Sequence, residues 1–247
     1  MNFFSLYKRK LFYNLRRKKL IDSDNINFNS LDKLFNYYGS DKANVFSKTQ
    51  SQGHGYSKFY EKKLENFKTQ KINILEIGSF SGASAAAFVK YFTDVNIFCF
   101  DINISNFKYK SKSIHVFGLD INNEKQVNKN LELIFNKHEI NNFDLIIDDG
   151  SHNLSDILIS IKFFFKHLKQ KGLYIIEDFK YPNYHKYNNN IDHIFIDELL
   201  KNLTEKQLFK SNVLNENDQK NLINSIELIE NFKGNLNDSD ITFIKKK

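Results

Sequence analysis

The stretch LEIGSFSGAS (residues 75–84) decides the fold of this chain. INILEIG (72–78) is a short apolar run that ends at glycine and predicts a buried strand, whereas the Ala-rich SGASAAAFVKYF (81–92) predicts a helix. Glycines at 78 and 82 let the backbone approach a ligand that a Cβ would obstruct. The spacing is GxxxG rather than the GxGxxG of dinucleotide folds, and no Lys-Ser/Thr pair follows as in a P-loop. We therefore expect a strand-to-helix turn that binds a different class of ligand.

The alternation of strand and helix continues along the chain. Further strands are predicted at 95–102, 113–120, 143–150 and 172–178, and helices at 124–138 and at 154–172, where Gly172 ends the second one. The tail, 223–234 and 238–247, predicts a closing pair of strands in the same sheet. Strands that are apolar on both faces and alternate with helices indicate an α/β, doubly wound, mostly parallel sheet covered on each side.

We expect one domain with three parts. Residues 1–21 form a basic amphipathic N-terminal arm, residues 22–70 a helical pre-core segment, and residues 71–247 the core. Within the core, the pattern breaks over 179–222, which contains the only proline, Pro182. Because that stretch follows the carboxyl end of the fifth strand, where open α/β sheets bind ligands, it is predicted to be a lid or acceptor-recognition segment.

The net charge of +7 belongs entirely to the arm. Residues 1–21 hold seven basic side chains and no acid, so the other residues carry 29 basic and 29 acidic groups. Phe, Leu and Tyr are interleaved with these charges, which fits two arrangements: a helix on an anionic membrane surface, or a helix packed on the domain or on a second subunit. A neutral body disfavours nucleic acid as a partner.

The single cysteine, Cys99, lies in an apolar run and predicts a packed core thiol rather than a disulfide. A reducing, cytoplasmic setting fits, with contact to the inner face of the membrane through the arm. No run of roughly 20 apolar residues occurs, so no membrane span is expected. We expect a homo-oligomer.

The glycine-rich turn predicts a first site. Glu76, Gly78, Ser79, Gly82 and Ser84 surround the turn, and an acid just before it suits a ligand with a positive group. Asp101 ends the second strand, where an acid accepts hydrogen bonds from ribose hydroxyls, and Asp120 ends the third, near an adenine edge. A ribose, an adenine and a cationic tail together describe S-adenosylmethionine. The alternative is a doubly wound fold whose acids only cap helices.

The stretch IIDDGSH (146–152) predicts a second site. Asp148 and Asp149 end the fourth strand, Glu177 and Asp178 end the fifth, and neighbouring strands lie roughly 4.8 Å apart. Converging carboxylates repel one another, and either a divalent cation with oxygen ligands or protonation of one or two carboxyls resolves the repulsion. His152 is positioned to be a general base, although a histidine at a helix start also serves as a cap.

On these residues the chain resembles the class I S-adenosylmethionine-dependent methyltransferases over roughly 72–247. The resemblance implies a seven-stranded, Rossmann-like sheet whose last strand is antiparallel. It also implies that Glu76, Gly78 and Ser79 line the methionine part of the cofactor, that Asp101 binds the ribose and that Asp120 approaches the adenine. Asp148 is expected to face the cofactor side.

Four motifs narrow the resemblance: DDGSH on strand four, ED on strand five, GSDK (39–42) and HGYSKFYEKKLE (54–65). They are similar to motifs of the macrocin- and mycinamicin-type O-methyltransferases, Mg²⁺-dependent enzymes that methylate a sugar hydroxyl. Cephalosporin-hydroxylase-like proteins share parts of the pattern. The resemblance implies Asp149, Glu177 and Asp178 as metal ligands and His152 as general base. It also implies that a pre-core segment, including Tyr56, closes over the cofactor.

The function expected from the sequence is transfer of a methyl group from S-adenosylmethionine to a sugar hydroxyl of a polysaccharide or a glycosylated small molecule. Mg²⁺, Asp149 and His152 are the expected catalytic groups. The alternatives are metal-independent N-methylation of a small amine or amide, RNA methylation or RNA binding through the arm, and a non-catalytic partner that only binds the cofactor.

Overall fold

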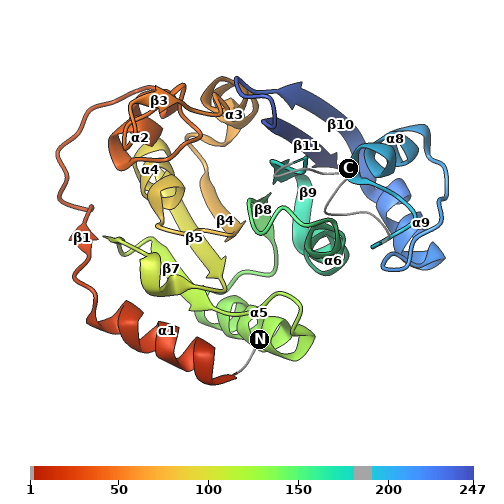
Figure 1. The fold of residues 1–247 in the computed structure, drawn as a ribbon, viewed down its shortest axis with the longest axis horizontal. Helices are drawn as coiled ribbons and strands as arrows, with labels where there is room; N and C mark the ends of the chain where they lie inside the picture. The colour runs from red at the N-terminus through yellow and green to blue at the C-terminus, as the bar shows by residue number, and fades with distance from the viewer. Residues whose placement is uncertain (1–2, 181–190) are drawn as a thin grey trace.

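A computed structural model of the chain describes residues 3–180 and 191–247, and within these ranges seven strands form one sheet in the order β10-β11-β9-β8-β4-β5-β7 (Figure 1). Five strands run parallel: β4 (Lys71–Ile77), β5 (Asp94–Asp101), β7 (Ile114–Gly118), β8 (Phe143–Asp148) and β9 (Leu168–Glu177). The last strand, β11 (Asp240–Lys246), lies antiparallel between β9 and β10 (Ile226–Lys233). The predicted doubly wound sheet with an antiparallel last strand is therefore confirmed.

Helices cover both faces of the sheet, and each face buries its own apolar cluster. On one face lie α2 (Leu31–Tyr38), α3 (Ser57–Leu64) and α4 (Ala83–Tyr91). On the other lie α5 (Glu124–His138), α6 (Leu154–Phe164), α8 (Ile196–Glu205) and α9 (Glu216–Ser225). Strands buried on both sides explain the continuous apolar runs in the sequence.

The helix predicted over 154–172 is wrong in its second half. It ends at Phe164, a short 3-10 turn η3 (Phe165–His167) follows, and β9 already begins at Leu168. Leu168 pairs with Phe143 of β8, and the register then shifts so that the next pairing is Leu173 with Leu145. A leucine at position 168 satisfies a helical apolar face as well as it satisfies this strand, so the pattern alone does not separate the two.

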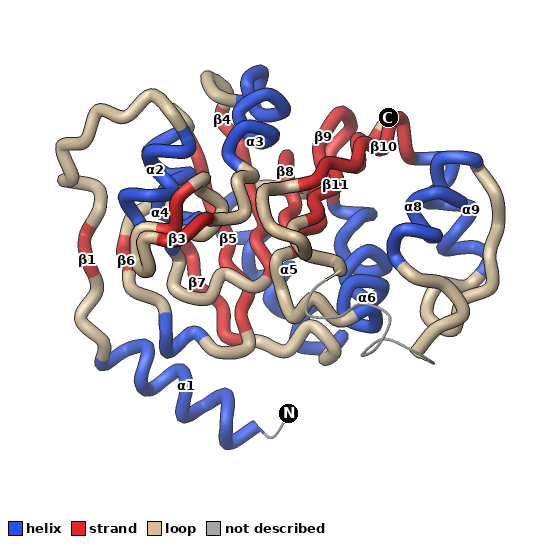
Figure 2. The backbone as a smooth tube through the Cα atoms, turned by 45° about the horizontal axis from the view of Figure 1, so that its top comes forward, coloured by secondary structure: helices blue, strands red, loops and turns tan. Residues whose placement is uncertain are grey.

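The N-terminal arm forms a helix, α1 (Phe3–Leu15), followed by β1 (Lys19–Leu20), which pairs in parallel with β6 (Tyr109–Lys110). In Figure 2, α1 lies at the periphery of the molecule, and it packs on η2 (Ile104–Asn106). In the described ranges, no helix combines the length and the apolar character needed to cross a bilayer. The remaining short elements are β2 (Val45–Phe46), β3 (Ser51–Gln52) and η1 (Glu65–Phe67).

The predicted lid segment, 179–222, contains the helix expected around IDELLKNL, which is α8. Pro182 and the run of three asparagines fall in 181–190, outside the described residues. The assignment of this segment as a lid stays a prediction.

Candidate active site

A cavity of about 340 Å³ opens at the carboxyl ends of β4, β5 and β8. Three chain segments and Asp101 line it: the pre-core loop 39–48, the turn 78–84 and the loop 149–152. A volume of this size is in the range of small-molecule sites. Its lining residues are Gly39, Ser40, Asp41, Lys42, Phe46, Lys48, Gly78, Ser79, Phe80, Ser81, Ala83, Ser84, Asp101, Asp149, Gly150 and His152.

The two-residue period of a strand decides which acids reach this side of the sheet. Ile74 of β4 and Ile175 of β9 pack in the cluster under α2, α3 and α4. Glu76 and Glu177 follow them at a spacing of two and therefore point to the same face. Both carboxylates are almost completely buried.

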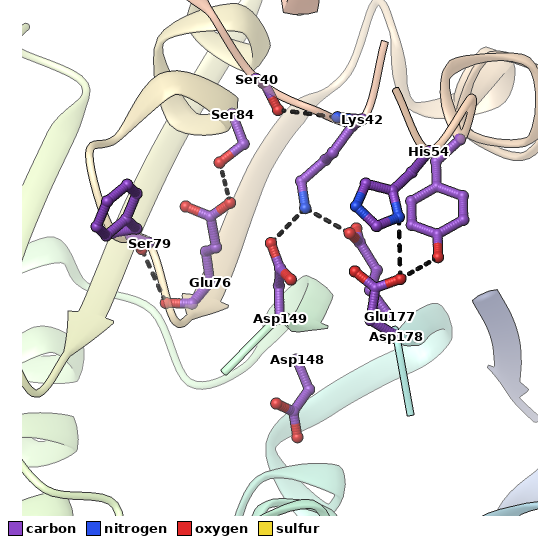
Figure 3. Close-up of polar contacts among 12 residues, drawn as sticks. Ser40, Lys42, His54, Glu76, Ser79, Ser84, Asp148, Asp149, Glu177 and Asp178 are labelled. Atoms are coloured by element: carbon purple, nitrogen blue, oxygen red, sulfur yellow. Dashed lines mark hydrogen bonds and ion pairs between the residues drawn. The ribbon is translucent and has the colours of Figure 1, made fainter. Parts of the chain in front are cut away.

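Glu76 does not line the cavity but contacts residues that do. Its carboxylate accepts a hydrogen bond from the Ser84 hydroxyl, and the Ser79 hydroxyl donates to the Glu76 carbonyl oxygen at 3.3 Å (Figure 3). Burial raises the pKa of Glu76 above its usual range. Ser79 and Ser84 themselves line the cavity, so Glu76 fixes the hydroxyls that a ligand would meet.

Asp101 lines the cavity beside the turn 78–84 and holds that turn in place. The backbone N–H of Phe80 donates to Asp101 Oδ2 at 2.7 Å, and the N–H of Asn103 donates to Oδ1 at 2.5 Å. The carboxylate remains partly exposed. It is thus oriented by backbone donors and open to a hydroxyl-bearing ligand, as the ribose prediction requires.

Gly78 lets the end of β4 pack against the loop that carries Asp149. Its φ is +86°, and a Cβ there would lie 2.0 Å from the Asp149 carbonyl oxygen. We expect Gly78→Ala to lower the free energy of unfolding by about 3 kcal/mol, because it adds a clash to a strained backbone conformation. Urea unfolding measures the loss.

Gly150→Ala is the matched control for this prediction. A Cβ at Gly150 would meet only Asp148 Oδ1 at 3.3 Å and Ile77 Cγ2 at 3.6 Å, which is close to ordinary contact. Equal stability of the two alanine variants would contradict the role given to Gly78.

Asp148 points away from the cavity (Figure 3). It follows Ile146, which packs in the cluster under α5 and α6, so its side chain lies on that face and meets Ser160 of α6. Burial raises the pKa of Asp148 to about 7. The sequence predicted Asp148 on the cofactor side, but the structure places adjacent Asp148 and Asp149 on opposite faces of the sheet.

Gly82 and Asp120 also lie outside the cavity lining. Gly82 starts α4 with φ +74°, and a Cβ there would collide with the Phe107 ring at 2.3 Å. Asp120 follows β7 and accepts a hydrogen bond from the N–H of Asn122 at 3.1 Å. Their contact with a cofactor stays a prediction.

A lysine from the pre-core loop joins the carboxylates of the second site. Lys42 is 1% exposed, and its ammonium lies 2.5 Å from Asp149 Oδ2 and also contacts Glu177 Oε2 (Figure 3). Burial alone would lower the pKa of Lys42, but the two carboxylates outweigh it and hold the pKa well above its usual range. Lys42 therefore stays charged and is the internal counter-ion of the cluster.

The other carboxylates are bound by the same segment. The Tyr60 hydroxyl donates to Glu177 Oε1, so Tyr60 and Lys42 together engage both oxygens of Glu177. Asp178 accepts from the Tyr56 hydroxyl and lies 3.2 Å from His54 Nδ1. Burial alone would raise the pKa of Asp178, but the hydrogen bonds from His54 and Tyr56 hold it below its usual range.

The donors that fit a divalent cation are Asp149, Asp178 and His152. One ligand atom from each lies within 4.8 Å of the others, and two of the three are carboxylate oxygens, which suits Mg²⁺ or Mn²⁺. Glu177, the third ligand implied by the sequence resemblance, is occupied by Lys42 and Tyr60 here. Its role as a ligand stays a prediction.

His152 and Asp149 both line the cavity. His152 Nε2 lies 4.0 Å from Asp149 Oδ1, and the φ of His152 is +59°, a left-handed conformation that non-glycine residues seldom adopt. Asp178 has φ +51° and Phe80 has φ +41°. His152 and Phe80 line the cavity, and Asp178 lies in the adjoining group of possible metal ligands. Strained backbone of this kind is typical of a functional site, where the surrounding structure holds it in place.

Sequence reasoning missed what the pre-core segment contributes chemically. Lys42, His54 and Tyr60 were within the quoted motifs but had no assigned partner, and each contacts a carboxylate at the carboxyl end of β8 or β9. Tyr56 reaches Asp178 rather than the cavity lining. The sequence offered a compositional signal alone: a segment with a lysine, a histidine and tyrosines in a chain whose acid cluster had no assigned counter-ion.

No protein-family model matches the chain. Among curated proteins, it is 28% identical over 133 residues to mycinamicin VI 2''-O-methyltransferase of Micromonospora griseorubida, which covers 51% of this chain and 31% of that protein. It is 30% identical over 155 residues to L-olivosyl-oleandolide 3-O-methyltransferase of Streptomyces antibioticus, covering 60% of this chain and 36% of that protein. The matched region spans about a third of each relative.

The solved structures give the same fold. The mycinamycin-pathway methyltransferase MycE, solved with Mg, SAH and mycinamycin VI, superimposes with a TM-score of 0.65 at 20% identity. The superposition covers 88% of this chain and 54% of that one. These similarities confirm the class I methyltransferase fold and the resemblance to macrolide-sugar O-methyltransferases.

Proposed function

We propose that the chain is an S-adenosylmethionine-dependent O-methyltransferase that acts on a sugar hydroxyl of a polysaccharide or a glycosylated small molecule, with a divalent cation and His152 as general base. One observation carries the proposal. A single cavity brings together Asp101, the turn at Gly78 and the pair Asp149–His152. The curated relatives are named as methyltransferases of sugar hydroxyls, which supports this substrate class.

In the proposed reaction, the cofactor's ribose binds Asp101 and its methionine part lies along Gly78, Ser79 and Ser84. His152 Nε2 takes the proton from the acceptor hydroxyl while the hydroxyl oxygen attacks the sulfonium methyl in line. The bond between sulfur and methyl carbon breaks, and S-adenosylhomocysteine leaves. Asp149, 4.0 Å from Nε2, stabilises the imidazolium that forms.

When bound, a divalent cation held by the carboxylates of Asp149 and Asp178, with the His152 imidazole left unligated as the base, would lower the pKa of the acceptor hydroxyl. The chain's own contribution is to hold the two reactants at fixed positions and to exclude water. The loop 39–48 supplies one wall of the cavity, and Lys42 ties that loop to the sheet. Such placement contributes a large part of the rate in bimolecular transfer.

Residues 179–222 are the proposed acceptor side of the site. They leave the carboxyl end of β9 directly after Asp178 and include α8 and most of α9. The ends of parallel strands are where this fold class binds its ligands.

Metal removal tests the proposal. We expect protein treated with EDTA to lose methyl transfer to sugar acceptors and to regain it with Mg²⁺, because the bound cation lowers the pKa of the acceptor hydroxyl. Transfer of the radiolabelled methyl group to a panel of nucleotide-sugars and oligosaccharides measures the activity. Calorimetry with S-adenosylhomocysteine, performed with and without metal, checks that the cofactor still binds.

The outcomes separate the alternatives. Full transfer by the metal-free protein would overturn the metal assignment, and transfer only to amines or amides would favour N-methylation. Cofactor binding without transfer to any acceptor would favour a non-catalytic binding protein. Failure to bind S-adenosylhomocysteine would overturn the proposed function as a whole.

A further inference from the structure

Helix α1 presents an apolar stripe to solvent. Tyr7, Leu11 and Leu15 are spaced by four residues and therefore share one face of the helix. Their side chains are 63%, 48% and 73% exposed, and the adjacent Phe12 is 51% exposed. A stripe of this kind on a helix is normally buried against something.

The opposite face of α1 is already in use, which fixes the direction of the stripe. The Tyr13 ring packs edge-on against Phe107 with 6.4 Å between centroids. Arg9 Nη1 donates to the Ile102 carbonyl oxygen at 2.8 Å. Since these contacts hold α1 against the domain, Tyr7, Leu11 and Leu15 face outward.

Exposed apolar side chains are concentrated in this arm. Among residues 5–180 and 191–247, thirteen large apolar side chains are exposed, and five of them lie between residues 7 and 20. The arm also contains the entire charge excess of the chain, seven basic groups in residues 1–21 with no acid. Apolar stripe and positive charge therefore coincide on one short element.

We infer that α1 docks flat on an anionic lipid surface. Insertion of the stripe would remove its aliphatic and aromatic groups from water, and Lys8 and Lys10 would meet the lipid phosphates. A second copy of the chain is a poorer fit because the rest of the molecule has equal numbers of basic and acidic groups and therefore no net negative charge to attract the arm. RNA would complement the charge but would leave Leu11 and Leu15 in water.

The docked helix would also orient the cavity. Ile102, the residue whose carbonyl accepts from Arg9, directly follows Asp101 in the cavity wall. The membrane would thus lie on the side of the molecule where α1 packs near the end of β5. This inference stands on the helix alone and does not depend on the proposed reaction.

Co-sedimentation with extruded vesicles tests the docking. The full chain is expected to bind equimolar phosphatidylcholine–phosphatidylglycerol vesicles and to release them at high salt, because surface charges are screened. The double variant with Leu11→Ser and Leu15→Ser is expected to have a lower affinity for the vesicles, by about tenfold for each leucine replaced. Leu133→Ser, an equally exposed leucine of α5, is the matched control and should bind like the unaltered chain.

Several results would overturn the inference. The first is that the chain does not bind the vesicles. The second is that the Leu11, Leu15 double variant binds them as well as the unaltered chain does. The third is that the chain binds vesicles of phosphatidylcholine alone equally well. A dimer in light scattering that dissociates in the Leu11, Leu15 double variant would instead assign the stripe to a second copy. Binding to polyuridine that is lost in the same variant would assign it to RNA.

Discussion

Substitution of His152 by asparagine is expected to reduce the rate of methyl transfer by about 10²–10⁴-fold, the usual contribution of a positioned general base. Asparagine tolerates the left-handed backbone conformation at this position, φ +59°, better than alanine does. The asparagine substitution therefore removes the base without adding backbone strain. A loss of activity then reports the missing base rather than a loss of folding. Single-turnover transfer to the best acceptor measures the effect.

Two further measurements separate a base from a merely structural histidine. Affinity for S-adenosylhomocysteine should be unchanged, because the groups expected to bind it lie in the turn 78–84 and at Asp101. In His152→Gly, added imidazole should restore part of the lost rate by replacing the missing side chain. His138→Asn, a change at a half-buried histidine that ends α5 and lies outside the cavity lining, is the control. Normal turnover in His152→Asn would rule out the base assignment.

The positions of the strand-end acids were predictable because local rules decide them. An apolar run that stops at acids predicts a buried strand with polar groups at its end, and Asp149, Glu177 and Asp178 all lie where this rule puts them. The orientation of Asp148 follows from the same period of two, since neighbouring residues in a strand face opposite sides. The alternation of residues along the strand therefore already places Asp148 and Asp149 on opposite faces, but the motif DDGSH draws attention to both acids as one group.

Long-range pairings were not predictable in the same way. Lys42 is 107 residues from Asp149 and 135 from Glu177 in sequence, and no periodic pattern connects them. The early start of β9 at Leu168 depends on a register shift against β8, which is a property of the pair of strands. Topology had to be known before these contacts could be assigned.

Substitution of Lys42 by methionine is expected to lower the free energy of unfolding by about 3–5 kcal/mol, because it leaves two buried carboxylates without their counter-ion. Methionine retains much of the volume, so the loss reports charge rather than a cavity. Urea unfolding measures it. Lys169→Met is the matched control: Lys169 pairs with Asp144 at 2.9 Å but is 41% exposed, and such a pair contributes at most about 1 kcal/mol.

Mg²⁺ then distinguishes a counter-ion from an ordinary packing residue. A divalent cation should bind more tightly to the Lys42→Met cluster than to the unaltered one, because the competing ammonium is gone and the carboxylates remain. At ten times its dissociation constant, the cation would return about 1.4 kcal/mol of the lost stability. Lys42→Arg, which keeps the charge, should show no such gain. The contradicting result is that Mg²⁺ stabilises the methionine variant no more than it stabilises the unaltered chain. In that case the Lys42 ammonium does not take the place of a metal ion, and protonation of the carboxylates neutralises the cluster.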